Sequence, residues 1–172
     1  AQTAAALAGH PARKLPVVGI TGTNGKTSIA WMLESMAHAA QHPAAVIGTT
    51  GHRIAGHKRP ARHTTPEAPV IQQILREALE QGCHMAVMEV SSIGLALRRV
   101  DAIPFAVGVF TNLSQDHLDF HGDMHSYMVA KARLFEELMA PDGAAIINGD
   151  PVEHKEIRPR CARTWRFGTH ED

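Results

Sequence analysis

The sequence has little of what several protein classes depend on. Its 172 residues include only two cysteines, Cys83 and Cys161, which match no metal-ligand spacing, so we expect reduced thiols rather than a disulfide framework. No apolar run reaches the roughly 18 residues that a membrane span needs. The Ala-rich start also lacks the basic end and long apolar centre of a signal peptide. These absences predict a cytoplasmic protein with no membrane partner.

Net charge is also absent. The chain carries 17 basic and 17 acidic residues, so its formal charge at pH 7 is zero. A general surface for nucleic acid or for anionic lipid is therefore not indicated, and any phosphate binding must be local. The sequence gives no direct sign of self-association, and we expect a monomer.

Short apolar runs alternate with helical patterns along the chain. The predicted strands cover 15–21, 44–49, 84–90, 105–111 and 144–148, with a sixth candidate at 164–167. The predicted helices cover 26–41, 66–81 and 124–139, and residues 51–65 are expected to form a loop or small hairpin. This alternation predicts an α/β fold with a mainly parallel sheet flanked by helices.

We expect one domain over residues 17–172. Residues 1–16 are predicted to be an N-terminal tail or inter-domain connector. The chain stops soon after its last candidate strand without an evident closing helix, so we expect the domain to be truncated at its C-terminal end. Both ends indicate a piece of a longer protein.

The segment from Val17 to Thr27 is typical of a strand, a glycine turn and a helix start. Gly22 and Gly25 allow backbone N–H groups to turn toward an anion, and the helix N-terminus adds partial positive charge. Lys26 is expected to reach the β- and γ-phosphates and Thr27 to offer its hydroxyl to Mg²⁺. Ile20 replaces the first glycine of the longer pattern, so the match is to G-x-x-G-K-T. The remaining predicted nucleotide-binding residues are Thr23, Asn24 and Ser28.

The loop predicts a nucleotide but does not choose which one. We find no Asn-Lys-x-Asp segment of the kind that reads guanine, so ATP is favoured and a simple GTPase is a poor alternative. The alternative without a binding function is a Gly-rich turn with an incidental lysine, and the preceding strand and following helix argue against it.

Two further strand ends carry polar side chains. Glu89 ends an apolar strand, where a carboxylate is costly unless it is paired, and a hard oxygen there suits Mg²⁺. His117 lies in the polar run that follows the strand ending at Thr111, and it is our preferred ligand there. Because the carboxyl ends of parallel strands meet at one edge, we expect both residues beside the phosphate loop. The alternatives without a binding function are a solvated carboxylate for Glu89 and a surface histidine for His117.

Lys131 falls on the apolar stripe of its predicted helix, with Tyr127, Leu134 and Leu138. A lysine on that face must snorkel, pair with a carboxylate, lower its pKa or be modified. The sequence alone leaves these alternatives open.

Five segments together resemble the Mur ligases, in the family's order and over nearly the whole chain. They read GTNGKT, HTTP, MEVSS, FTNLSQDHLDFHG and YMVAKARLF, over residues 22–27, 63–66, 88–92, 110–122 and 127–135. The resemblance is greatest to the members that add the third amino acid to UDP-N-acetylmuramoyl-L-alanyl-D-glutamate. It implies the P-loop NTPase-like central domain of that family, which binds ATP.

The resemblance implies an ATP-dependent peptide ligase of peptidoglycan precursor synthesis. A substrate carboxylate attacks the γ-phosphate to form an acyl phosphate, and an incoming amine then displaces phosphate. The implied partners are the UDP-MurNAc-dipeptide and a diamino acid, either meso-diaminopimelate or lysine. The family's domains for UDP and for the amino acid are not in this chain, so we expect it to be inactive alone.

The resemblance also implies individual roles. Thr27 and Glu89 would hold one Mg²⁺, His117 would hold a second, and Lys131 would be carbamylated by CO₂ to serve as an oxygen ligand. Asn148 matches the residue that reads adenine. The implied contacts to the muramoyl peptide are Thr64, Thr65, Ser91 and Arg99. Ile93 and Leu97 depart from the pattern, because the family often has His and Gln there, and these changes remove polar contacts near the substrate.

Two alternatives remain. The first is a folylpolyglutamate synthetase, which shares the loop, the acyl phosphate and the carbamylated lysine, although its loop usually reads GTNGKG where this chain has Thr27. The second is a non-catalytic nucleotide-binding module, which would keep the loop but need neither a second metal ion nor a carbamate.

Overall fold

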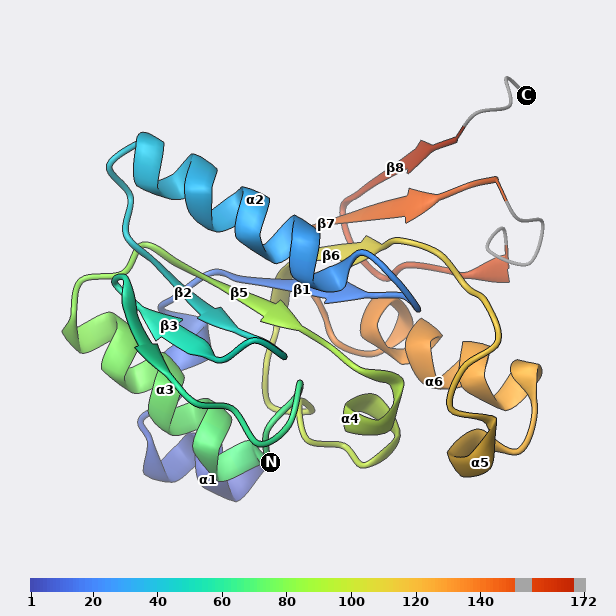
Figure 1. Cartoon of the computed structure of the whole chain (residues 1–172), viewed down its shortest axis with the longest axis horizontal. Coiled ribbons are helices and arrows are strands. Elements are labelled where there is room, and N and C mark those ends of the chain that lie inside the picture. Colours follow the sequence, from blue (N-terminus) through green and yellow to red (C-terminus); the bar gives the residue numbers. More distant parts are fainter. Residues whose placement is uncertain (151–155, 169–172) are drawn as a thin grey trace.

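The computed structural model describes residues 1–150 and 156–168, so the predicted C-terminal end of the domain, 169–172, lies outside the described residues. The described chain forms one eight-stranded sheet (Figure 1). From edge to edge its strands are β4 (His57–Arg59), β3 (His52–Ile54), β2 (Ala44–Ile47), β5 (Met85–Glu89), β1 (Val17–Thr21), β6 (Phe105–Phe110), β7 (Met139–Asn148) and β8 (Arg163–Phe167). Neighbours pair in parallel from β2 to β8, whereas β3 and β4 form an antiparallel hairpin at one edge.

Helices cover both faces of the sheet, as the alternating pattern predicts. One face carries α2 (Lys26–Ala39), and the other carries α3 (Ala68–Glu80), α4 (Ser92–Ala96) and α6 (Met124–Glu136) (Figure 1). The single turn α5 (Leu118–His121) precedes α6. The predicted α/β fold with a mainly parallel sheet is therefore confirmed. None of the helices in the described ranges combines the length and hydrophobicity that a bilayer crossing requires.

The larger hydrophobic core lies between the sheet and the α3–α6 side. On α3, Ile71, Ile74 and Leu75 are buried at helical spacing, and Phe135 of α6 packs into the same cluster. Each such side chain contributes about 1.5–3 kcal/mol when it is fully buried. A smaller cluster, which includes Val18 and the partly buried Ile29 and Leu33, seats α2 on the opposite face. The two clusters fix the sheet between its helical layers.

The topology brings three strand ends together. β1 lies between β5 and β6, with Ile20 in register with Glu89 and Thr21 in register with Phe110. The connection after β1 runs over the α2 face, whereas those after β5 and β6 run over the opposite face. Chains that leave neighbouring strands toward opposite faces open a crevice at the carboxyl edge, where ligands bind in such sheets.

Several boundaries differ from the sequence-based expectation. The helix predicted from Pro66 begins at Ala68, because Glu67 is still extended and Pro69 occupies the first turn, where its missing N–H costs nothing. The helix predicted to run to Met139 ends at Glu136. Residues 137–138 connect the helix to β7, which starts early because Met139 pairs with Phe105 across the sheet. Residues 51–65 do contain the predicted small hairpin.

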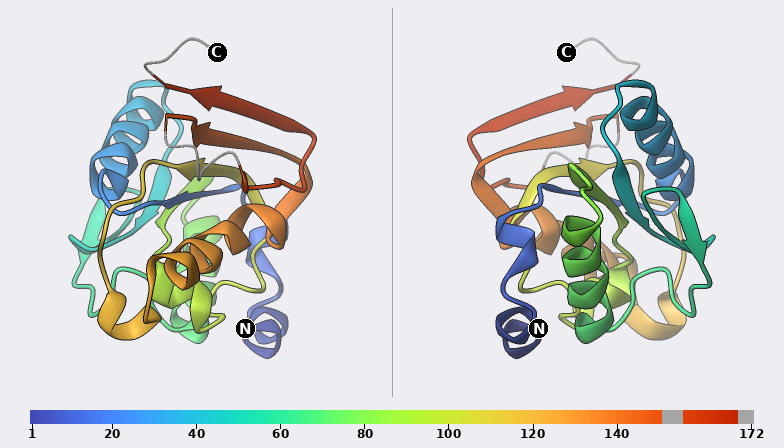
Figure 2. Two further views of the ribbon diagram at one scale, coloured as in Figure 1. Left: turned by 90° about the vertical axis from the view of Figure 1, so that its right-hand side faces the viewer. Right: turned by 90° about the vertical axis from the view of Figure 1, so that its left-hand side faces the viewer.

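The N-terminal residues pack against the rest of the domain. Helix α1 (Gln2–Leu7) lies beside α3 (Figure 2), and a 3₁₀ turn, η1 (Pro11–Arg13), leads into β1. Ala5 and Leu15 are buried there. Whether this segment connects to another domain stays a prediction.

Candidate functional site

The loop between β1 and α2 has the strand–turn–helix form that the sequence predicts. Gly22 and Gly25 both have positive φ, +136° and +89°. A Cβ on Gly22 would lie 1.9 Å from Thr111 Oγ1, so only glycine fits there. Gly25 is the N-cap of α2. The amides from Gly25 to Ser28 therefore open the helix without intrahelical acceptors, which is the arrangement that binds an anion.

A hollow of about 240 Å³ lies at this loop and gathers most of the predicted site residues. It is lined by Thr23, Asn24, Gly25, Lys26, Thr27, Ser28, Thr49, Thr64, Glu89, Ser91 and His117. Except for Thr64, which lies between β4 and α3, the residues come from the ends of β1, β2, β5 and β6, which the parallel topology brings to one edge. The expected convergence of Glu89 and His117 on the phosphate loop is therefore present.

Glu89 is buried beside the loop, and both of its carboxylate oxygens accept hydrogen bonds. Its Oε2 accepts hydrogen bonds from Thr27 Oγ1 at 2.9 Å and from Thr49 Oγ1 at 3.1 Å, and its Oε1 accepts one from Thr49 N at 3.1 Å. A carboxylate beside a threonine hydroxyl supplies the hard oxygen donors that suit Mg²⁺. Within 1–150 and 156–168 no three His, Cys, Asp or Glu side chains cluster as a complete metal site. A cation here would therefore need oxygen ligands from phosphate and water as well.

Two lysines meet beneath the loop. Lys26 Nζ donates to Gly22 O at 2.9 Å and to Thr23 O at 2.8 Å, and Lys131 Nζ donates to the same Gly22 oxygen at 2.9 Å. Lys131 is 1% exposed and its Nζ lies 4.4 Å from the centre of the Tyr127 ring. The snorkelling alternative is therefore wrong, because the amine points into the loop.

Burial shifts the titration of both lysines. Burial, helped by the nearby charge of Lys26, lowers the pKa of Lys131 to about 7. Burial also lowers the pKa of Lys26, although the negative charges of Glu89 and Asp116 partly offset it. A substantial fraction of Lys131 is therefore a neutral amine near physiological pH.

His117 lies at the rim of the hollow. It adopts a left-handed conformation at the start of α5, and its side chain is 45% exposed. Its backbone N–H donates to Asp116 Oδ1 at 2.9 Å. Burial lowers the pKa of His121, four residues along the chain, and the charges of His117 and Lys131 lower that pKa further. His117 is accessible to an added ligand, and its role in holding a second metal ion stays a prediction.

The residues implied to contact a muramoyl peptide lie on one side of the hollow. Thr64 Oγ1 is 2.9 Å from Thr49 Oγ1, and Ser91 lines the same hollow. Thr65 is buried, and its hydroxyl donates to Glu89 O and accepts from Ser91 N, both at 2.9 Å. Arg99 donates to Thr65 O at 2.9 Å and pairs with Glu67. In this structure Thr65 and Arg99 hold the loop before α3 against the end of β5. Contact with substrate stays a prediction for all four implied residues.

Asn148 ends β7 at the same edge of the sheet. Its Nδ2 donates to Thr111 O at 2.9 Å and its Oδ1 accepts from Asp150 N at 3.0 Å. Its implied role in reading adenine stays a prediction. Ile93 is half-buried and Leu97 is 52% exposed, both on or just after α4, so neither replaces a polar group inside the core.

Sequence reasoning missed several residues that shape the site. Thr49 holds Glu89, Asn112 pairs with the backbone of Asn24, and Tyr127 places its hydroxyl 3.1 Å from Thr23 Oγ1. The available signals were the two threonines that follow β2 and the Thr-Asn pair that follows β6. Their partners are distant in sequence, so the pattern alone does not reveal them.

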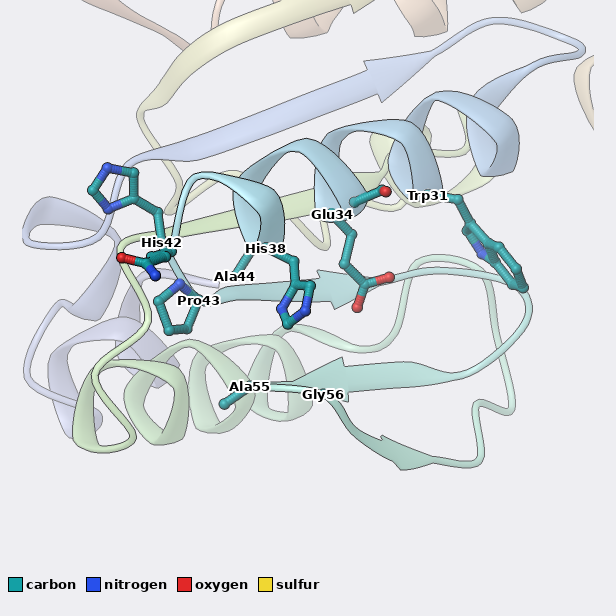
Figure 3. A pocket seen from close by; sticks show the side chains of 10 residues that line it. Trp31, Glu34, His38, His42, Pro43, Ala44, Ala55 and Gly56 are labelled. Atoms are coloured by element: carbon teal, nitrogen blue, oxygen red, sulfur yellow. The ribbon is translucent and has the colours of Figure 1, made fainter.

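A larger hollow of about 770 Å³ lies between α2 and the β2–β3 edge (Figure 3). Its lining is mostly apolar, and its acid, Glu34, forms a bidentate contact with Arg53 at 2.7 and 2.8 Å. None of the predicted site residues lines it. The remaining lining residues are Trp31, Ser35, His38, Gln41, His42, Pro43, Ala44, Ala55 and Gly56. The smaller hollow, with its helix amides and Lys26, is the one suited to phosphate.

Comparison with known proteins identifies the family of the chain. The Mur ligase middle domain matches residues 20–172. The UDP-N-acetylmuramoyl-L-alanyl-D-glutamate–2,6-diaminopimelate ligase of Geobacter sulfurreducens is 51% identical over 152 residues, which are 86% of this chain and 30% of that protein. A solved structure of a ligase with the same name superposes with a TM-score of 0.79 at 33% identity, covering 92% of this chain and 33% of the other.

A more distant neighbour shows the same fold. A Mycobacterium tuberculosis folylpolyglutamate synthase, complexed with ADP and AMPPCP, gives a TM-score of 0.75 at 21% identity and covers 96% of this chain and 46% of the other. This chain spans about a third of the length of the curated relatives that it matches, 30% in one case and 35% in another.

Proposed function

Because the chain belongs to the Mur ligase family and spans its middle domain, we propose that it binds ATP with Mg²⁺ at the loop from Gly22 to Thr27. We propose further that it serves a peptide ligase that joins a diamino acid to UDP-MurNAc-L-Ala-D-Glu. The relatives of about 50% identity are named for 2,6-diaminopimelate, which favours this diamino acid over lysine. We also propose, as the sequence predicts, that the protein is cytoplasmic and monomeric.

One observation carries the proposal: Thr27, the first hydroxyl of α2, bonds to the buried carboxylate of Glu89 directly beside open helix amides. Burying a carboxylate is costly unless it is paired, yet the hydrogen-bond partners of Glu89 are neutral donors, and the nearby Lys26 donates to loop carbonyls instead. A magnesium ion bound to ATP would supply the missing positive charge. Thr27 and Glu89 fit this ion through their oxygens.

The reaction would be a phosphoryl transfer followed by amide formation. A substrate carboxylate attacks the γ-phosphorus and ADP leaves; the incoming amine then attacks the acyl carbon and inorganic phosphate leaves. Phosphoryl transfer depends mainly on positioning and on positive charge around the phosphate oxygens. Lys26 lies at the loop to give that charge, and the amides from Gly25 to Ser28 orient the phosphates.

Lys131 is proposed to be carbamylated. Its neutral Nζ would attack the carbon of CO₂, forming a nitrogen–carbon bond and releasing one proton, which leaves a carbamate anion. The lowered pKa of Lys131, about 7, favours the amine that this step requires. The modification would also replace repulsion between Lys131 and Lys26 with attraction. With His117 at the rim, the carbamate oxygen would offer a site for the second Mg²⁺.

The remaining implied roles belong to the same proposal. Thr64, Thr65, Ser91 and Arg99 would face the muramoyl peptide from the β2 and β5 side. Asn148 would read the adenine beyond the end of β7. The folylpolyglutamate alternative is disfavoured because its solved relatives share only the fold at 21% identity. The non-catalytic alternative leaves the buried Lys131 without a role.

A chimaera tests the proposed function. In the Geobacter sulfurreducens ligase, the segment that this chain matches is replaced by this chain, and ADP release is measured. We expect release that requires both UDP-MurNAc-L-Ala-D-Glu and diaminopimelate, and that falls sharply in the Glu89→Gln chimaera. Release supported instead by a folate and glutamate, or release independent of any acceptor, would contradict the proposal. The chain alone is expected to show little or no turnover.

A further inference from the structure

The residues directly after β6 continue the pairing of β1 with β6 past the ends of both strands. Thr111 N donates to Thr21 O at 3.0 Å, and Thr23 N then donates to Asn112 O at 3.0 Å. The first half of the phosphate loop therefore lies against the segment after β6 like one more step of the sheet. The Cβ that Gly22 lacks would also lie 3.1 Å from both N and O of Asn112.

The side chain of Asn112 completes this pairing. Its Oδ1 accepts from Asn24 N at 2.9 Å, and its Nδ2 donates to Asn24 O at 3.1 Å. The same Asn24 oxygen accepts from Thr111 Oγ1 at 2.6 Å. Both backbone groups of Asn24 are thus occupied, and among the amino-acid side chains only an amide of this length offers a donor and an acceptor side by side.

This pairing divides the loop into two halves. The amides of Thr23 and Asn24 are bonded to Asn112. The amides of Gly25, Lys26, Thr27 and Ser28 begin α2 and have no intrahelical acceptors. We propose that Asn112 is a positioning residue for the nucleotide: it holds the first half of the loop so that the second half alone presents its amides to the phosphates.

The proposal rests on the proposed nucleotide binding, and nuclear magnetic resonance of the 172-residue chain tests both. We expect the amide resonances of Gly25, Lys26, Thr27 and Ser28 to shift on addition of MgADP and to gain protection from hydrogen exchange. The Asn24 amide should be protected from exchange before MgADP is added, and should remain so. Exchange of the Asn24 amide at the rate of an open loop would overturn the proposal.

Two substitutions at Asn112 separate positioning from general stability. Asn112→Leu keeps the approximate shape and removes both hydrogen bonds, so we expect at least a tenfold loss of Asn24 protection and about tenfold weaker MgADP binding by calorimetry. Asn112→Asp keeps the acceptor for Asn24 N but loses the donor and adds negative charge near the phosphates. It should therefore retain Asn24 protection while still weakening MgADP binding.

Gln115→Ala is the matched control, because Gln115 is an exposed amide on the same segment and lies outside the hollow. It should change MgADP affinity by less than about twofold, well within the range of neutral surface substitutions. Affinity in Asn112→Leu equal to that of the wild type would overturn the proposal, even with Asn24 protection lost. If Asn112→Leu does not fold, hydrogen exchange of the Asn24 amide and the amide shifts in the wild-type chain still decide the proposal.

The two proposals fail in different ways. Absence of any MgADP binding by the wild-type chain would overturn the proposed function, and with it the phosphate assignment, whatever the exchange data show. Binding with unchanged affinity in both Asn112 variants would overturn only the positioning role. Binding that shifts Thr23 and Asn24 most strongly, with their bonds to Asn112 broken, would also overturn it.

Discussion

Lys26 and Lys131 donate to the same acceptor, the carbonyl oxygen of Gly22, each at 2.9 Å. One comes from the start of α2 and the other from the middle of α6, on the opposite face of the sheet. Two ammonium groups that share one oxygen repel each other unless one gives up its proton or gains a negative partner. The fold therefore holds a lysine poised to be neutral directly beneath the loop that we propose binds phosphate.

The buried Lys131 predicts a pH dependence of stability. Its folded pKa is about 7, whereas the ordinary value of 10.5 applies to the unfolded chain. Between these values the unfolded state binds one more proton, so stability rises with pH by up to about 1.4 kcal/mol per unit. This gain in stability is complete above pH 10.5, and it is lost as the pH falls to about 7. Urea unfolding of wild type and Lys131→Met in CO₂-free buffer should show this slope in the wild type alone; parallel profiles would contradict it.

The proposed carbamylation of Lys131 can be measured directly. We expect the chain in ¹³C-bicarbonate at pH 8 to show a carbamate carbon resonance, because the neutral amine predominates above a pKa of about 7. Lys131→Arg keeps a cation but has no amine to react, and should lack the resonance. A signal of equal strength in this variant would assign the carbamate to another group.

Lys26 should govern phosphate affinity. Replacing it with methionine removes a charge-assisted contact, so we expect MgADP binding to weaken about 10- to 100-fold by calorimetry. Lys58→Met, on the exposed strand β4, removes the same charge away from the loop and serves as the control. Equal losses in the two variants would indicate a general effect of charge.

Glu89 should couple nucleotide binding to magnesium. In Glu89→Gln the carboxylate is lost but the shape is kept, so the gain in ADP affinity on adding Mg²⁺ should shrink about tenfold or more. Glu80→Gln changes an exposed residue of α3 that pairs with Arg76 at the surface, and it should retain the full gain. A full magnesium effect in Glu89→Gln would move the cation elsewhere.

Gly22 should be intolerant of a side chain. Gly22→Ala places a Cβ 1.9 Å from Thr111 Oγ1 at a φ of +136°, and we expect a loss of about 3 kcal/mol or more in unfolding free energy. Gly56 also has a positive φ, +87°, but its Cβ would meet nothing within 4 Å. Its alanine variant should cost only about 1–2 kcal/mol. Similar losses in the two variants would show that conformation, and not close approach, sets the requirement at Gly22.

The sequence was sufficient for features that depend on local pattern. The order of strands and helices follows from periodicity, and the strand–turn–helix loop follows from Gly22, Gly25 and Lys26. The position of Glu89 beside the loop followed from the rule that parallel strands share a carboxyl edge. Lys131 was placed on an inward stripe by helical spacing, and the structure buries it there.

Features that depend on pairing between distant segments were not predicted. The early start of β7 comes from Met139 pairing with Phe105, which overrides the helical pattern before it. The bonds of Asn112 to Asn24 and of Thr49 to Glu89 join residues 88 and 40 positions apart. Single-residue propensities carry no information about such registers, so only the folded arrangement reveals them.

The most direct test is a crystal structure of the chain with Mg²⁺ and a non-hydrolysable ATP analogue. We predict β- and γ-phosphates on the amides from Gly25 to Ser28, with Mg²⁺ about 2.1 Å from Thr27 Oγ1 and Glu89 within its coordination sphere. A nucleotide seated in the larger hollow between α2 and β3, or phosphates that leave these amides untouched, would contradict it.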